Sequence, residues 1–209
     1  VYDNYASLKD DGSAAPQTDK IDYLRQILYV GYKFSDRLLF NSEIEFEHAD
    51  TSKSGVVEVE FGYIDYLLNP SINLRSGFVL MPVGIYNELH EPPTFYSTRR
   101  PEVEQKIIPS TWRGNGGGIY GSIGENWQYR IFLCESLNVY GTTANITSAG
   151  IRNGRQSGSA AYAEDFALSG RLDYEWSPGT VLGASFFNGG IDQSRLSGVQ
   201  SSLLLWDVH

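Results

Sequence analysis

The sequence of 209 residues contains no long uninterrupted run of apolar residues. A membrane-spanning helix needs about 18 or more of them in succession, so a helical span within this sequence is excluded. Cysteine is nearly missing too, because Cys134 is the only one. A single cysteine cannot form an internal disulfide, and in a predicted strand we expect it to be a small wall residue without a redox role.

Basic residues are in short supply. Lysine and arginine together number 16, against 25 aspartates and glutamates, which gives a formal net charge of -9 at pH 7. A protein that binds nucleic acid needs a basic surface that displaces counterions from the phosphates. The charge balance therefore argues against a nucleic-acid partner.

The sequence also lacks the spacings typical of metal, phosphate and catalytic sites. None of the three histidines, His48, His90 and His209, is followed by a second ligand at helical or turn spacing. The segment RGNGGG at residues 113–118 lacks the Lys-Ser/Thr pair of a phosphate-binding loop. No Ser-His-Asp arrangement is recognisable. We therefore predict no catalytic residue, no metal ligand and no cofactor.

What the sequence has in abundance is residues that favour strands and turns: 14 Tyr, 10 Phe, 4 Trp and 22 Gly. The stretch RLLFNSEIEFEHAD, residues 37–50, alternates strictly, with Glu43, Glu45 and Glu47 on one parity and mostly apolar residues on the other. Alternation with period two indicates a β-strand that has one charged and one apolar face. The predicted fold class is all-β.

The same alternation recurs along the chain. In the segment 56–68, the two glutamates at 58 and 60 are expected on the face opposite to Val57, Val59, Phe61 and Tyr63. Nine strands are predicted in total, the last of them cut short, at residues 24–34, 37–50, 56–68, 72–81, 116–124, 127–137, 166–176, 180–188 and 201–209.

The predicted connections alternate between short and long. Short turns fall at 35–36, 69–71, 125–126 and 177–179, and longer connections fall between them. Short turns at one end and long loops at the other are typical of an antiparallel up-and-down barrel of the bacterial outer membrane, whose strands need about 9 to 11 residues to cross the bilayer. A Greek-key sandwich has no reason to keep this order.

Several motifs point to a known family. They are Pro82-Val83-Gly84, EPPTF at 91–95, RRPEVE at 99–104, IIPSTWR at 107–113 before a Gly-rich strand start, and NGRQSGS at 153–159. With these motifs, most of the chain resembles the phosphate-selective porin O and P family of Gram-negative outer membranes, or the porin-like group assigned with it. The segment 82–113 is the most specific part of the resemblance.

The resemblance implies an integral outer-membrane protein. Members of this family are sixteen-stranded barrels, usually homotrimers, with a loop folded into the lumen, and they pass small hydrophilic solutes or ions. We accordingly expect residues 1–209 to form a single transmembrane β-barrel domain in contact with outer-membrane lipid. We expect this domain to be incomplete at its C-terminal end, and the N-terminal end is open to the same question.

The segment 82–115 is predicted to be the constriction loop. A long loop in a compact domain is unusual unless it is functional, and the prolines of this one hold it extended. Apolar anchors could pin it against an inner wall, where it would narrow the pore: Phe95, Tyr96, Ile107, Ile108 and Trp112. The alternative is a mobile extracellular loop.

If the apolar side chains of each strand face lipid, the charged side chains at the alternate positions line the lumen. The predicted lumen residues are Arg25, Lys33, Glu43, Glu45, Glu47, Glu58, Glu60, Arg75, Arg130, Arg171, Asp173 and Glu175. We expect part of them to pair across neighbouring strands, Arg25 and Lys33 with the glutamates at 43–47, and Arg75 with the strand that carries Glu58 and Glu60.

Charged rings in a pore select solutes by the sign of their charge. A phosphate channel needs a ladder of Arg and Lys along its lumen. Here the basic residues cluster only in the constriction loop, where acidic residues lie among them: Arg99, Arg100, Glu102, Glu104, Lys106 and Arg113. The sequence therefore favours a general or weakly selective diffusion pore, with anions such as phosphate among its candidate solutes.

Two other functions fit the same pattern. The barrel could be plugged and act as an adhesin or a scaffold. Alternatively, paired carboxylates such as Glu43 and Glu45 could serve as acid and nucleophile of a soluble β-sandwich glycoside hydrolase.

Overall fold

The chain folds around one antiparallel sheet of nine strands. The computed structural model describes residues 2–3, 20–97, 100–140, 150–194 and 200–209. Each strand of the sheet pairs with the next one along the chain, in the order β3 to β11. The strands are β3 (Arg25–Lys33), β4 (Leu38–Glu47), β5 (Val56–Asn69), β6 (Ile72–Leu80), β7 (Arg113–Ile123), β8 (Trp127–Glu135), β9 (Phe166–Ser177), β10 (Thr180–Gly190) and β11 (Ser202–Val208).

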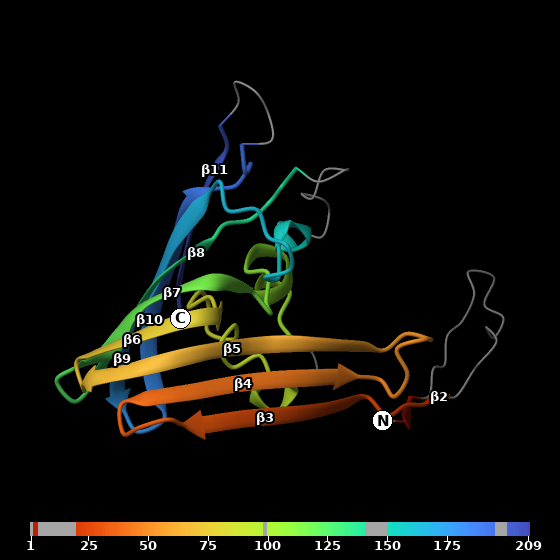
Figure 1. Ribbon diagram of the computed structural model, residues 1–209, viewed down its shortest axis with the longest axis horizontal. Helices are drawn as coiled ribbons and strands as arrows, with labels where there is room; N and C mark the ends of the chain where they lie inside the picture. Colours follow the sequence, from red (N-terminus) through yellow and green to blue (C-terminus); the bar gives the residue numbers. More distant parts are fainter. Residues whose placement is uncertain (1, 4–19, 98–99, 141–149, 195–199) are drawn as a thin grey trace.

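The prediction of an all-β chain with nine consecutive antiparallel strands is confirmed. Short turns lie at one end of the sheet and long connections at the other, as Figure 1 shows. The sheet is not closed into a barrel, since β3 and β11 are its two edges. A second, small sheet, which the sequence did not predict, joins β1 (Tyr2–Asp3) to β2 (Lys20–Ile21).

In the residues that the structure describes, helical structure is confined to single turns. They are η1 (Pro92–Thr94), the π-helical turn η2 (Val103–Ile107) and η3 (Arg152–Gly154). No helix of the described residues has the length and the apolar character needed to cross a membrane.

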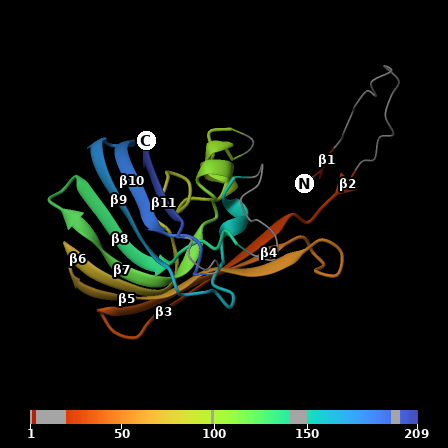
Figure 2. The ribbon, with the colours of Figure 1, turned by 90° about the horizontal axis from the view of Figure 1, so that it is seen from above.

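The sheet is strongly curved, and its two faces differ in character. Figure 2 shows the strands as a curved sheet, with the connection between β6 and β7 on its concave side. The convex face carries large apolar side chains that are exposed along every strand, among them Val30, Val57, Ile64, Leu74, Ile131, Leu133, Leu168, Leu182, Leu204 and Trp206. Because successive side chains leave opposite faces of a strand, the charged parity lies on the concave side.

One part of the predicted face assignment is wrong. A β-bulge in β5 shifts the register between Glu43 and Ile44 of β4, so that Glu43 pairs with Phe61 and Ile44 pairs with Val59. The extra residue reverses the parity of β5 beyond the bulge. Phe61 and Tyr63 therefore lie on the concave face with Glu43, and not on the convex face with Val57.

The connection between β6 and β7, residues 81–112, is called the inserted loop below. It is shorter at its C-terminal end than the predicted 82–115, because Arg113 already belongs to β7. Two of the five predicted anchors, Ile108 and Trp112, are buried, whereas Tyr96 and Ile107 are 91% and 58% exposed and are not anchors. Phe95 is half-buried and packs on Tyr86.

The apolar core lies between the inserted loop and the concave side of the last strands. The ring of Trp112 packs against that of Phe187 in β10, with centroids 4.4 Å apart and planes inclined by 41°, and Phe132 of β8 and Cys134 are fully buried in the same cluster. Cys134 is thus the small wall residue that the sequence predicted. This core covers part of the concave face, and charged side chains lie over β4 and β5, along the loop and beside the core on β8 and β9.

Candidate functional site

The concave side of β4 and β5 forms an acidic wall. Glu43, Glu45 and Glu60 are between 2% and 7% exposed, although each is a carboxylate in mid-strand. Burial of a charge is costly unless it is paired, so this wall needs cations. Arg25 of β3 supplies one, because it forms an ion pair with Glu45 and lies 3.1 Å from Glu47 (Nη2 to Oε1). The predicted pairing of Arg25 is confirmed.

A second cation reaches the wall from β7. Arg113 forms ion pairs with both Glu58 and Glu60 of β5, and its own side chain is almost completely buried. The sequence placed Arg113 in the constriction loop. In the structure it is the first residue of β7 and pairs with Leu80 of β6.

Three further arginines face the acidic wall. Arg100 of the inserted loop and Arg152 and Arg155 of the connection between β8 and β9 line a cavity of about 240 Å³ together with Glu45, Glu47, Glu58 and Glu60. Burial and the neighbouring positive charges lower the pKa of each of these arginines, that of Arg155 to about 10. Charges of opposite sign therefore face each other across a polar hollow.

Arg155 also ties the two long connections together. Its Nη1 donates to the carbonyl oxygen of Pro109 at 3.2 Å and to that of Thr111, and its Nε donates to that of Arg152 at 3.1 Å. Neither Arg152 nor Arg155 was predicted as a site residue. They lie in a polar loop without periodicity, and only the motif NGRQSGS marked the segment.

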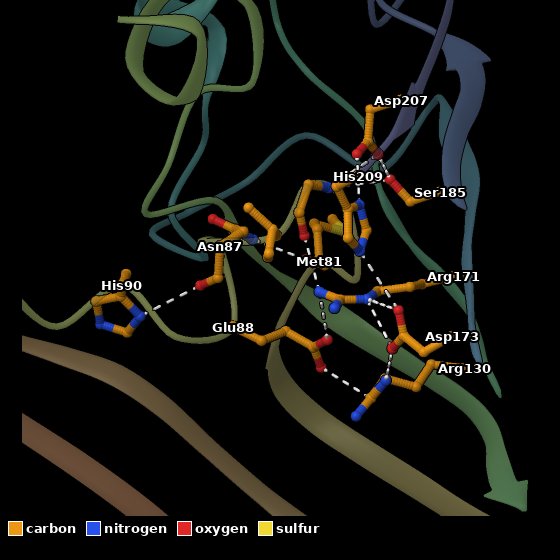
Figure 3. A network of polar contacts seen from close by, with 12 residues as sticks. Met81, Asn87, Glu88, His90, Arg130, Arg171, Asp173, Ser185, Asp207 and His209 are labelled. Atoms are coloured by element: carbon orange, nitrogen blue, oxygen red, sulfur yellow. Dashed lines mark hydrogen bonds and ion pairs between the residues drawn. The ribbon is translucent and has the colours of Figure 1, made fainter. Parts of the chain in front are cut away.

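Outside this hollow, the inserted loop is held by a network around Glu88. Its carboxylate lies 3.1 Å from Nε of Arg130 in β8 and 3.8 Å from Nη1 of Arg171 in β9. Asp173 accepts hydrogen bonds from both arginines, at 3.1 Å from Arg130 and 2.8 Å from Arg171 (Figure 3). Burial raises the pKa of Glu88 despite the two guanidinium groups.

The first residues of the inserted loop are hydrogen-bonded to the last two strands of the sheet. The backbone nitrogen of Gly84 donates to Oγ of Ser185 in β10 at 2.9 Å and to Oδ1 of Asp207 in β11 at 3.3 Å. Gly84 has a φ of +75°, and an added Cβ would lie 2.8 Å from a carboxylate oxygen of Glu104, so only glycine fits here.

Only a few residues beyond Gly84, the loop has reached the opposite wall. His90 Nε2 lies 3.6 Å from Oε2 of Glu60 in β5, and Glu91 Oε2 lies 3.5 Å from Nη1 of Arg25 in β3. Burial lowers the pKa of His90, although the nearby carboxylates oppose this effect. The segment 84–91 therefore crosses the concave face from one wall to the other.

Glu104 is a buried carboxylate inside the loop itself. Its Oε1 accepts a hydrogen bond from the backbone nitrogen of Ile85 at 3.2 Å, and its Oε2 accepts one from Oγ of Ser110 at 3.2 Å. Burial raises the pKa of Glu104 despite these donors. Its partners belong to the loop, so its visible role is to fold the loop on itself.

Other predicted residues are placed differently from the expectation. Arg75 pairs with β5, as predicted, but its partner there is Asp65, with Nε 2.8 Å from Oδ1. The guanidinium of Arg75 also lies 3.8 Å from the centre of the Tyr63 ring. Asp65 was not among the predicted residues, because the bulge in β5 reverses the facing of the residues that follow it. The pairing predicted for Lys33 is wrong, since Lys33 binds Asp36 in the adjacent turn at 2.7 Å.

Three more predicted residues lie away from the hollow. Glu175 is exposed near the end of β9. Glu102 and Lys106 form an exposed pair on the outer side of η2, with a distance of 2.9 Å between Oε2 and Nζ. Arg99 lies outside the described residues.

Comparison with known proteins gives one relative. An uncharacterized protein of Aquifex aeolicus (strain VF5) is 44% identical over 174 residues, which cover 82% of this chain and 39% of the relative. The chain thus spans well under half the length of that relative. No protein-family model matches the chain, and no solved structure matches it significantly.

Proposed function

We propose that this chain forms part of an outer-membrane β-barrel porin, with its convex face toward lipid and its concave face toward a water-filled channel. The observation that carries the proposal is the division of one curved sheet into an exposed apolar face and a charged face beneath a loop. The cargo would be small hydrophilic solutes or ions, with no chemistry performed on them.

The apolar convex face supports a lipid environment. Soluble monomers rarely expose contiguous apolar patches of more than a few hundred Å². Here large apolar side chains follow one another across nine strands, and several are more than half exposed, such as Val57 at 51%, Leu133 at 52% and Trp206 at 72%. Outer-membrane strands alternate in this way, with apolar residues outward and polar residues inward.

The open edges of the sheet are compatible with the proposal only if further strands close it. A lipid-exposed sheet edge would leave backbone groups without hydrogen bonds. Since 174 residues make up 39% of the Aquifex protein, that relative is about 450 residues long. A chain of this length has room for the seven additional strands of the sixteen-stranded barrel implied by the family resemblance, which also implies a homotrimer.

The path of the inserted loop is evidence in favour of a narrowed channel. It crosses the concave face between Gly84 and Glu91, and it leaves a polar hollow of about 240 Å³ with carboxylates on one side and arginines on the other. Such a passage would discriminate between hydrated solutes by the sign of their charge. It lacks the continuous row of Arg and Lys that phosphate selectivity requires. A general or weakly selective pore is therefore the function we favour.

The experiment is a single-channel recording from the full-length protein in a planar bilayer with a salt gradient across it. Discrete conductance steps are expected, and the sign of the reversal potential reports whether the acidic wall or the arginines dominate. A protein that stays soluble without detergent would contradict the membrane location.

The apolar core between the inserted loop and β8–β11 favours one alternative, a plugged barrel that acts as an adhesin or a scaffold. A protein shown to be inserted in the bilayer but without conductance steps would support it. A soluble β-sandwich hydrolase would need a second sheet over the apolar face. The only other sheet in the described part of the chain is the β1–β2 pair.

A further inference from the structure

Three side chains that could bind a metal ion meet where the inserted loop touches β4. They are Glu43 of β4 and His90 and Glu91 of the loop, and one ligand atom of each lies within 4.8 Å of the others. Glu43 is 2% exposed and His90 is 4% exposed. Two strongly buried polar groups therefore point into the same small space from different elements.

The hydrogen bonding of His90 fixes which of its nitrogens is available. Nδ1 lies 3.2 Å from the carbonyl oxygen of Asn87. Figure 3 marks this contact with a dashed line. A carbonyl oxygen can only accept a hydrogen bond, so Nδ1 carries the proton of the neutral ring and Nε2 carries the lone pair. A metal-binding histidine is commonly held in this way by a backbone carbonyl at its other nitrogen.

Asn87 makes that orientation rigid. Its Nδ2 donates to the carbonyl oxygens of Met81 and Trp112, both at 2.7 Å, and its Oδ1 accepts from the backbone nitrogen of Trp112 at 2.6 Å. Asn87 thus clamps the two ends of the inserted loop together. The turn that carries His90 is therefore positioned before any ligand binds.

The free nitrogen of His90 faces oxygen atoms that cannot donate to it. Nε2 is 3.8 Å from Oε1 of Glu91 and 3.6 Å from Oε2 of Glu60. Within the described part of the chain, His90 Nε2, Glu43 Oε1 and Glu91 Oε1 are buried atoms without a hydrogen-bond partner. A lone pair opposite carboxylate oxygens is unfavourable unless a cation lies between them.

The side-chain cations nearby are engaged elsewhere. Arg113 is bound to Glu58 and Glu60, and Arg100 donates from Nη2 to the carbonyl oxygen of His90 at 3.1 Å. Arg25 is shared between Glu45, Glu47 and Oε2 of Glu91. Among the described residues, Glu43 forms no ion pair with any lysine or arginine.

We propose that Glu43, His90 and Glu91 bind a divalent transition-metal ion of the Zn²⁺ type, which links the inserted loop to β4. One imidazole and two carboxylates suit Zn²⁺, Mn²⁺ or Fe²⁺, whereas Ca²⁺ and Mg²⁺ prefer oxygen ligands alone. The three residues also line a cavity of about 270 Å³ with Tyr29 and Tyr63, which has room for water at the remaining coordination positions. The site does not depend on channel activity.

The test is isothermal titration calorimetry of the chelator-treated full-length protein in detergent, with Zn²⁺ alone as the probe. We expect one ion per chain. Loss of a ligand should weaken binding at least as much as loss of an outer hydrogen-bond partner does, by about 10- to 100-fold. The variants are Glu43→Gln and His90→Gln, and the controls are Glu125→Gln in an exposed turn and His48→Asn near the end of β4.

The outcomes separate clearly. Tight binding by the wild type and both controls, with weak binding by both ligand variants, supports the site. No binding by the wild type, or equal binding by the ligand variants, overturns it. If a variant fails to fold, X-ray absorption of the Zn²⁺-loaded wild type decides, because scattering from one imidazole is expected and its absence would contradict the proposal.

Discussion

The carboxylate of Glu88 in the inserted loop lies 3.1 Å from the guanidinium of Arg130 in β8. This ion pair connects the first part of the loop to the strands that carry the apolar core. Arg171 approaches the same carboxylate from β9 at 3.8 Å, so one loop residue is held by two strands. The loop is therefore held by ion pairs to β8 and β9 where it crosses the concave face, in addition to its apolar contacts.

Replacing Glu88 should loosen the inserted loop. In the variant Glu88→Ala, Arg130 and Arg171 keep Asp173 but lose their shared partner in the loop. The expected cost is about 1.5–3 kcal/mol, the range for hydrogen bonds to charged groups. Limited proteolysis should then cut the loop faster than in the wild type. The control Glu102→Ala removes an exposed carboxylate from the same loop and should leave the rate unchanged; equal rates for all three proteins would refute the role of Glu88.

Arg155 should hold the two long connections together. The variant Arg155→Gln cannot reach the carbonyl oxygens of both Pro109 and Thr111, and each buried acceptor left unpaired costs about 1–3 kcal/mol. We expect a lower unfolding midpoint, measured by tryptophan fluorescence in urea. The exposed Arg37 in the turn after β3 is the matched control. A midpoint equal to that of the wild type and of Arg37→Gln would show that the connections are held by other contacts.

Glu104 should make the stability of the protein depend on pH. Its pKa is raised by burial, so the unfolded chain releases this proton at a lower pH than the folded chain does. The stabilisation is complete below the ordinary glutamate pKa, about 4.3, and is lost as the pH rises through the raised value of the folded state. The variant Glu104→Gln has no carboxyl group at this position, so it does not lose this stability as the pH rises.

The expected result is a difference that appears only above the acidic range. At pH 7, Glu104→Gln should unfold at a higher urea concentration than the wild type, and the advantage should shrink at pH 4. The variant Glu102→Gln, which removes an exposed carboxylate of the same loop, should follow the wild type at both pH values. If the wild type were the more stable protein at pH 7, the hydrogen bonds from Ser110 and Ile85 would outweigh the burial of the charge.

The alternation of residues allowed the nine strands and their order in the sheet to be predicted. Each strand shows its own period of two, as Glu43, Glu45 and Glu47 do, and this pattern needs no knowledge of the partner strand. The bulge in β5 is different, because one extra residue changes the facing of every residue after it. Phe61 and Tyr63 were misplaced for this reason, and Asp65, the partner of Arg75, was overlooked.

The candidate sites could be predicted only in part. Arg25 pairs with the neighbouring strand, so strand order alone places it correctly. His90 and Glu43 are brought together by the path of a loop, which has no periodic pattern, and the spacing of histidines in the sequence could not reveal them. Lys33 pairs with Asp36 and not with the glutamates of β4. Asp36 lies in the short turn that follows β3, so it is the nearest negative charge along the chain.

The charge of the acidic wall should set the ion preference of the proposed channel. Glu47 and Glu58 are the least buried carboxylates of the wall, with side chains 45% and 46% exposed. The double variant Glu47→Gln, Glu58→Gln removes two negative charges from the hollow, and we expect the reversal potential in a salt gradient to shift toward anion preference. The variant Arg152→Gln should shift it in the opposite direction, and Glu125→Gln should not change it. Reversal-potential shifts of the opposite sign in these variants would show that ions do not pass through this hollow.

A charge on the convex face tests the membrane location directly, because lipid and water predict different results. Ile131 is 39% exposed at the middle of β8, and Ile123 is 57% exposed at the end of β7. In a bilayer, arginine costs about 2–4 kcal/mol near the midplane and about 0–1 kcal/mol near the interface, so Ile131→Arg should reduce the folded, membrane-inserted fraction far more than Ile123→Arg does. In a soluble protein both substitutions would be exposed and nearly neutral, within about 0.5 kcal/mol. Urea unfolding of the full-length variants in lipid vesicles measures the difference, and equal stability of the two variants and the wild type would refute a lipid-facing surface.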